Sequence, residues 1–157
     1  MVFIVFIFPL TSSAFLEETG FRGYALPLLQ QKYRPLVGTL IIGNFFGAWL
    51  LPEFFLEGSA QMSMGIGFYP FFIITEIAWS VIMTWIFNKT NESALVSGWL
   101  FHAFFNAWTM LLLTNAIPGE TFPMFDVQLL LVNALVLCVV ASILILTTRG
   151  KLGLSNN

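Results

Sequence analysis

Long apolar runs separated by short polar linkers dominate the chain. A transmembrane helix needs about 20 mainly apolar residues, and runs of that kind predict about five spans. The linkers between them are too short for a separate soluble domain. We therefore expect an all-α protein, a polytopic transmembrane helical bundle in which residues 1–157 form a single integral-membrane domain. The expected spans cover residues 2–29, 36–51, 69–87, 94–114 and 127–147.

The linkers alternate between basic and acidic along the chain. Cytoplasmic loops of membrane proteins are enriched in Lys and Arg. The basic linkers therefore predict the cytoplasmic side, with the N-terminus outside and the C-terminus cytoplasmic. A missed or extra span would break this alternation, so the charge pattern supports the odd count of five spans. In chain order the linkers carry Lys32 and Arg34, then Glu53 and Glu57, then Lys89, then Glu120 and Asp126, and finally Arg149 and Lys151.

The composition agrees with a membrane protein. Of the 157 residues, 58% are hydrophobic and only 9% are charged, whereas soluble domains carry roughly 25% charged residues. Six basic and eight acidic side chains give a net charge of −2. They form no basic patch of the kind that a phosphate backbone requires. We expect the lipid bilayer as a partner and no nucleic acid. The single cysteine, Cys138, excludes an internal disulfide and a cysteine-based metal site.

The first apolar run begins at Met1, without the positively charged segment that opens a secretory signal. We therefore expect no cleavable signal. The abrupt start indicates a shortened version or a fragment of a longer protein. The expected location is a bacterial-type cytoplasmic membrane, with the chain as an integral protein.

Three charged side chains lie inside the first expected span, where hydrocarbon should reject them. A charge at the bilayer centre costs about 2.5 to 3.5 kcal/mol, so Glu17, Glu18 and Arg22 must face protein or a water-filled cavity. Glu18 and Arg22 have the i, i+4 spacing of an ion pair. Such a pair can hold the bundle together or support chemistry. Neighbouring residues on a helix point about 100° apart, which leaves Glu17 without a full partner and makes it the candidate general base.

His102 and Asn106 share one face of the fourth expected span. They can be an interhelical hydrogen-bonding pair or two donors that converge on a developing oxyanion. At about 1.5 Å per residue, His102 lies about 14 Å from the basic linker, close to the depth of Glu17 and Glu18. The two groups can share one cavity if the first and fourth spans are neighbours. Glu76 lies nearer the outer end of the third span, and we interpret it as structural.

These residues resemble the motifs of the CPBP family, which includes the CAAX prenyl proteases and the bacteriocin-processing or Abi-type membrane proteins. The family carries EExxxR, then FxxxH, then HxxxN or HxxxD. Glu17, Glu18 and Arg22 match the first motif, and His102 and Asn106 match the third. In the second motif Phe46 is kept, but Leu50 stands where the family has histidine, and the chain has no other histidine to replace it. Family members usually have further helices before the first motif.

The resemblance implies peptide-bond hydrolysis inside the membrane. It implies Glu17 as the base, Glu18 and Arg22 as its ion-paired support, and His102 and Asn106 as oxyanion donors. The substrate would be a peptide or protein, such as a prenylated C-terminus or a leader peptide. The family is often labelled metal-dependent, but a catalytic zinc site needs three protein ligands and a water. With one histidine in the chain, we expect neither a metal site nor another cofactor.

Other functions remain to be weighed against this one. The HExxH of a site-2 protease, the GxSG of a rhomboid and the paired membrane aspartates of a presenilin are not present in the sequence. The main alternative is a catalytically degenerate family member that binds a peptide or confers bacteriocin immunity, and Leu50 favours it. A small channel or transporter is a more distant alternative, because the buried polar groups lie on only two spans.

Overall fold

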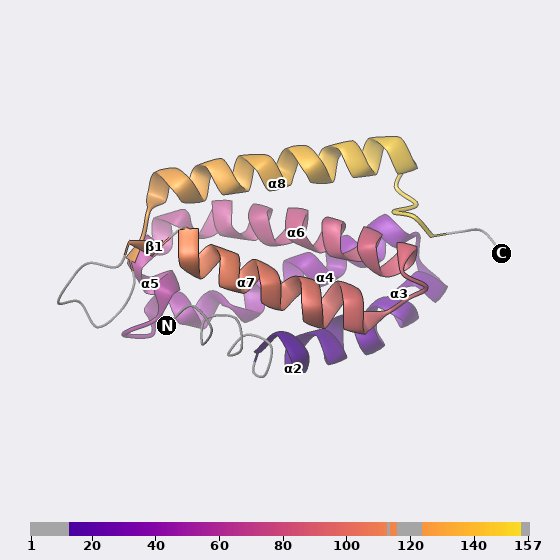
Figure 1. Cartoon of the computed structure of the whole chain (residues 1–157), viewed down its shortest axis with the longest axis horizontal. Coiled ribbons are helices and arrows are strands. Elements are labelled where there is room, and N and C mark those ends of the chain that lie inside the picture. Colours follow the sequence, from indigo (N-terminus) through magenta and orange to yellow (C-terminus); the bar gives the residue numbers. More distant parts are fainter. Residues whose placement is uncertain (1–12, 113, 116–123, 155–157) are drawn as a thin grey trace.

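The computed structural model describes residues 13–112, 114–115 and 124–154, and these are mostly helical (Figure 1). The expected all-α bundle is confirmed. A two-residue strand pair, β1 (Thr114–Asn115) and β2 (Met124–Phe125), is antiparallel. The α-helices are α2 (Ser13–Gly20), α3 (Leu26–Lys32), α4 (Pro35–Trp49), α5 (Ala60–Met64), α6 (Tyr69–Lys89), α7 (Phe101–Leu112) and α8 (Val127–Thr148). The other helical turns are η1 (Phe21–Ala25), η2 (Leu51–Phe55), η3 (Ile66–Phe68) and η4 (Leu95–Leu100).

Among the described residues, three helices are long and apolar enough to cross a membrane: Pro35–Phe55, Ile66–Lys89 and Val127–Thr148. They coincide with the second, third and fifth expected spans. The first expected span contains α2, η1 and α3, and the fourth contains η4 and α7. Residues 2–12 of the first span and residue 113 of the fourth lie outside the described residues. The helices thus fall where the apolar runs predict them, while the total of five spans stays a prediction.

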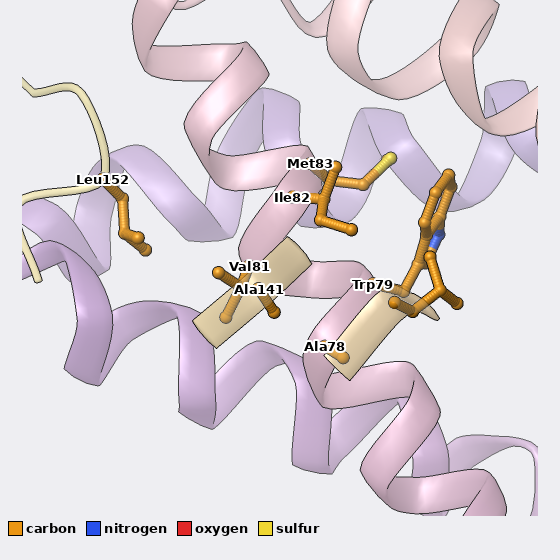
Figure 2. Close-up of a cluster of buried hydrophobic side chains, with 8 residues drawn as sticks. Ala78, Trp79, Val81, Ile82, Met83, Ala141 and Leu152 are labelled. Atoms are coloured by element: carbon orange, nitrogen blue, oxygen red, sulfur yellow. The ribbon is translucent and has the colours of Figure 1, made fainter. Parts of the chain in front are cut away.

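Helix α6 lies at the centre of the bundle (Figure 1). It packs against α4, α8 and η4, so it touches parts of three other expected spans. Its buried side chains form an apolar cluster with residues of α8 and with Leu152, which follows α8 (Figure 2). The cluster consists of Ala78, Trp79, Val81, Ile82, Met83, Leu137, Ala141 and Leu152. This core fixes α6 as the scaffold on which the remaining helices are placed.

Two glycines bring α4 into direct contact with α6. A Cβ atom at Gly43 would lie 2.8 Å from the Cα atom of Ile77, and one at Gly47 would lie 3.1 Å from a side-chain carbon of Ile73. The spacing of four residues puts both glycines on one helical face, where small residues let backbones approach closely. No larger residue fits at Gly43 without separating the two helices.

The basic linkers gather at one end of the bundle. The backbone N–H of Leu36 donates to the carbonyl of Gly150 at 3.3 Å, and the side chain of Asn88 donates to the carbonyl of Leu152 at 2.9 Å. These bonds join the starts and ends of α4, α6 and α8. The exposed basic residues at this end are Lys32, Arg34, Lys89, Arg149 and Lys151. Their shared position agrees with the alternating charge pattern, and the orientation in the membrane stays a prediction.

Candidate active site

The first candidate residues lie where α2 continues into the wider turn η1. Glu18, near the end of α2, and Arg22, in η1, are both buried, with 1% and 2% of their surfaces exposed. The guanidinium of Arg22 donates from Nη1 to Oε1 of Glu18 at 3.0 Å. The i, i+4 ion pair expected from the sequence therefore forms. Wide helical turns of the π type, like η1, occur frequently at functional sites.

His102, on α7, meets both glutamates of α2. Its Nδ1 atom lies 2.8 Å from Oε1 of Glu18, and its Nε2 atom lies 3.9 Å from Oε2 of Glu17. The imidazole is buried, while about a quarter of the Glu17 side chain is exposed. Glu17 is thus the more accessible acid of the two. The expected meeting of the first and fourth spans at one place is confirmed.

The Oε1 atom of Glu18 is shared by two donors. Arg22 and the Nδ1–H of His102 both point at this oxygen. A carboxylate that accepts from a ring N–H fixes the orientation and tautomer of the imidazole. The second ring nitrogen, Nε2, is on the side of Glu17 and is available to contact a bound molecule.

Aromatic rings enclose the imidazole of His102. Phe46 of α4 and Trp79 of α6 both meet it edge-on, with centroid distances of 6.2 Å and 6.3 Å. They come from two further helices, so the histidine sits where α2, α4, α6 and α7 converge. Apolar walls of this kind keep the local dielectric low, which strengthens charge interactions inside the site.

Gly98, in the wide turn η4, is a site residue that the sequence reasoning missed. A Cβ atom here would lie 2.6 Å from the Cβ of Glu18 and 3.3 Å from its Oε2. The absence of a side chain therefore lets η4 press against the glutamate. A single glycine in an apolar segment carries no sequence signal of such a role. Only the packing of η4 on α2 reveals it.

Asn106 stands one helical turn after His102 on α7 and is half-buried. Its side chain has no hydrogen bond to the other residues that the structure describes. The structure therefore brings Glu17, Glu18, Arg22 and His102 into contact, while it places Asn106 only on the neighbouring turn. The amide would be available to a molecule bound beside His102.

The segment with the altered second motif borders the same site. Leu50 ends α4 and is half-buried, and Phe46, one turn earlier, contacts His102. Glu53 lies in η2, three residues after Leu50, and sequence reasoning treated it only as a linker charge. Leu50 therefore puts an aliphatic side chain one turn after a residue that contacts His102.

Glu76, on α6, is half-buried. It stands one turn before Ser80, whose hydroxyl accepts from Nη2 of Arg22 at 3.1 Å. The sequence reasoning interpreted Glu76 as structural and did not single out Ser80. Glu76 and Ser80 are one turn apart, so both lie on the face of α6 that is turned to the Glu18–Arg22 ion pair.

The donor set fits a metal ion poorly. No group of three or more His, Cys, Asp or Glu side chains in the described part of the chain is arranged to hold one. Glu18 already accepts from Arg22 and His102 through one oxygen, and a guanidinium beside a carboxylate competes with a cation. Zinc would need three protein ligands, which Glu17 and His102 do not supply.

An apolar groove of about 430 Å³ lies on another side of α7. It is lined from α6, η4 and α7, and its lining is almost wholly apolar. Phe101 and Phe105, two of its walls, are the neighbours in sequence of His102 and Asn106. The lining residues are Ile86, Val96, Leu100, Phe101, Phe104, Phe105 and Trp108.

Together these features define a helical membrane protein with a buried cluster of two acids, an arginine and a histidine. Residues 1–108 match the model of the Rce1-like type II CAAX prenyl endopeptidases. The chain belongs to this family, and the resemblance to CPBP proteins is confirmed. All five candidate residues fall within the matched part.

A similar curated protein is CAAX prenyl protease 2 of Methanococcus maripaludis. It is 29% identical over 107 residues, which are 66% of this chain and 39% of that protein. The chain therefore spans about two fifths of the length of that relative. No solved structure matches the chain.

Proposed function

We propose that the protein is an intramembrane endopeptidase that hydrolyses a peptide bond with a glutamate-activated water. The observation that carries this proposal is the contact of His102 with Glu18 and its approach to Glu17, since it gathers a base, an oriented imidazole and a counter-ion in one buried place. Membership of a prenyl endopeptidase family supports it.

Glu17 is the base in this proposal. The 3.9 Å between its Oε2 and Nε2 of His102 is too long for a direct hydrogen bond, and a water can bridge polar groups separated in this way. Glu17 takes a proton from that water, whose oxygen then attacks the peptide carbonyl carbon. The proton passes to the leaving amine when the carbon–nitrogen bond breaks. General-base assistance of this kind typically contributes about 10² to 10⁴ in rate.

His102 and Asn106 stabilise the oxyanion that forms in the same step. Glu18, held by Arg22, keeps the imidazole in place through Nδ1. The mechanism requires a proton on each ring nitrogen, so that Nε2 donates to the oxyanion while Nδ1 donates to Glu18, and the amide of Asn106 donates from the next turn of α7. Preorganised donors are the larger part of many enzymes' rate enhancement. In this mechanism Glu18 and Arg22 hold the imidazole of His102 in place, and no metal ion is needed.

The substrate we propose is a peptide with an attached apolar chain. The name of the methanococcal relative specifies prenyl substrates for that protein, and the apolar groove beside α7 offers a surface for such a chain. Phe101, one of its walls, is the neighbour in sequence of His102.

A cleavage assay in lipid nanodiscs tests the proposal. A farnesylated peptide with a fluorophore and quencher across the scissile bond should be cleaved, and the same peptide without the farnesyl group should be cleaved more slowly. We expect turnover to persist with a chelator, because the site lacks the ligands for zinc. Complete loss with EDTA and recovery with a divalent ion would overturn the metal-free mechanism. No cleavage of either peptide would overturn the proposed function.

The alternative is a peptide-binding or bacteriocin-immunity protein that has lost catalysis. Leu50 at the border of the site favours it, since an aliphatic side chain cannot position water. In that case the farnesylated peptide binds in the nanodisc, as measured by fluorescence anisotropy, but is recovered intact. Binding with cleavage decides for the enzyme.

A further inference from the structure

Arg22 makes hydrogen bonds in two directions. Its Nη1 donates to Glu18, and its Nη2 donates to the hydroxyl oxygen of Ser80, on α6, at 3.1 Å. Ser80 is 2% exposed, so this hydrogen bond is shielded from bulk water. One nitrogen is thus tied to the acid of the site and the other to the central helix.

The Ser80 hydroxyl is itself held in place. It donates to the backbone carbonyl of Thr39, on α4, at 3.4 Å. A hydroxyl has one hydrogen, so donation to Thr39 leaves its oxygen lone pairs for Arg22. Thr39 is fully buried, and its own hydroxyl lies 3.0 Å from that of Thr84, one turn beyond Ser80 on α6. The hydrogen bonds therefore form a chain from Arg22 to Ser80 and from Ser80 to the backbone of Thr39, where α4 packs against α6.

The position of the guanidinium depends on Ser80. Without the bond to Ser80, the guanidinium is free to rotate away from Glu18. The bond to Ser80 fixes Nη2 at a point from which Nη1 reaches Glu18, whose other donor is His102.

We infer that Ser80 is a positioning residue. It holds the Arg22 guanidinium against α6 and through it keeps the Glu18 carboxylate aimed at the imidazole of His102. Ser80 does not touch the reacting atoms in this scheme. Its effect on turnover rests on the proposed function, but its effect on the histidine does not.

The single histidine of the chain provides a direct readout. The ¹⁵N imidazole resonances of the protein, labelled at histidine and placed in nanodiscs, arise from His102 alone. We expect Ser80→Ala to change the Nδ1 resonance, because Glu18 loses its fixed position. The matched control is Thr84→Val, which removes a buried hydroxyl one turn further along the same helix without touching Arg22. It should leave the resonance unchanged.

Two outcomes overturn the inference: an unchanged resonance in Ser80→Ala, or an equal change in Thr84→Val. Ser80→Cys has nearly the volume of serine with a weak donor, so it serves as the second variant if Ser80→Ala does not fold.

Turnover then separates this inference from the proposed function. We expect Ser80→Ala to lower kcat roughly tenfold with KM unchanged, the effect of losing a hydrogen bond to a charged group. A changed resonance in a protein that cleaves nothing would leave the positioning role intact and remove the proposed function. Normal kcat together with a changed resonance would show that the orientation of His102 is not needed for turnover, and would overturn the catalytic part of the role.

Discussion

Glu18 and His102 are 84 residues apart in the sequence, and their side chains meet at 2.8 Å. The oxygen that receives the imidazole also receives Arg22. One atom therefore connects the acid pair of α2 to the imidazole of α7. The contact turns two separate polar faces of apolar helices into one site.

Replacing the proposed base should abolish cleavage. Glu17→Gln keeps the size and hydrogen-bonding capacity of the side chain but cannot take a proton, so we expect kcat to fall by about 10² to 10⁴. Thermal unfolding should change little, because Gln has nearly the size of Glu and the Glu17 carboxylate, 3.9 Å from Nε2 of His102, makes no direct hydrogen bond to that ring. Glu57→Gln, in the exposed linker after η2, is the matched control. Unchanged turnover in Glu17→Gln would remove this residue from the mechanism.

Restoring the second-motif histidine should raise activity. Leu50→His places an imidazole at the end of α4, on the border of the acidic site, where it can help to orient water. We expect a higher kcat in the nanodisc assay. Leu51→His, one residue later and so pointing in a different direction, controls for the mere presence of a second histidine. If Leu50→His brings no gain, the position has a structural use.

Removing the counter-ion should destabilise the protein. Arg22→Ala leaves Glu18 buried without its cation, and breaking a buried pair from one side costs about 3 to 5 kcal/mol. We expect poor accumulation in the membrane, measured by immunoblot of membrane fractions against Arg34→Ala, an exposed arginine. Normal accumulation of Arg22→Ala would mean that the pair is solvated in the native protein.

The close approach of η4 to Glu18 can be tested with alanine. Gly98→Ala puts a Cβ atom 2.6 Å from the Cβ of Glu18, and overpacking of this kind costs about 1 to 3 kcal/mol. We expect a lower unfolding temperature and slower cleavage. Gly20→Ala, in the helix that carries Glu18, meets nothing within 4 Å and should be neutral or slightly stabilising. Equal effects of the two variants would contradict the packing described for Gly98.

The sequence predicts the helices and the ion pair well, for a physical reason. Apolar runs of membrane length are a strong local signal, and the i, i+4 spacing of Glu18 and Arg22 fixes their neighbourhood on one helix. The similar depths of Glu17 and His102 followed from helix rise alone. The prediction that the two side chains meet required α2 and α7 to be neighbours, and in the structure these helices are in contact.

The parts that escaped prediction depend on contacts between distant helices. Ser80 is one small polar residue in an apolar helix, and only the position of Arg22 gives it a role. Gly98 matters because Glu18 packs on it. Neither of these relations has a spacing that can be read along the chain.

The division between apolar and polar helices has a consequence for biogenesis. The helices Pro35–Phe55, Ile66–Lys89 and Val127–Thr148 are each long and apolar enough to cross a bilayer. The segment with Glu17, Glu18 and Arg22 would face a penalty of about 8 to 10 kcal/mol if it entered lipid without partners. Ser80 of α6 and His102 of α7 supply those partners. The polar cluster can therefore form only when these helices have assembled around it.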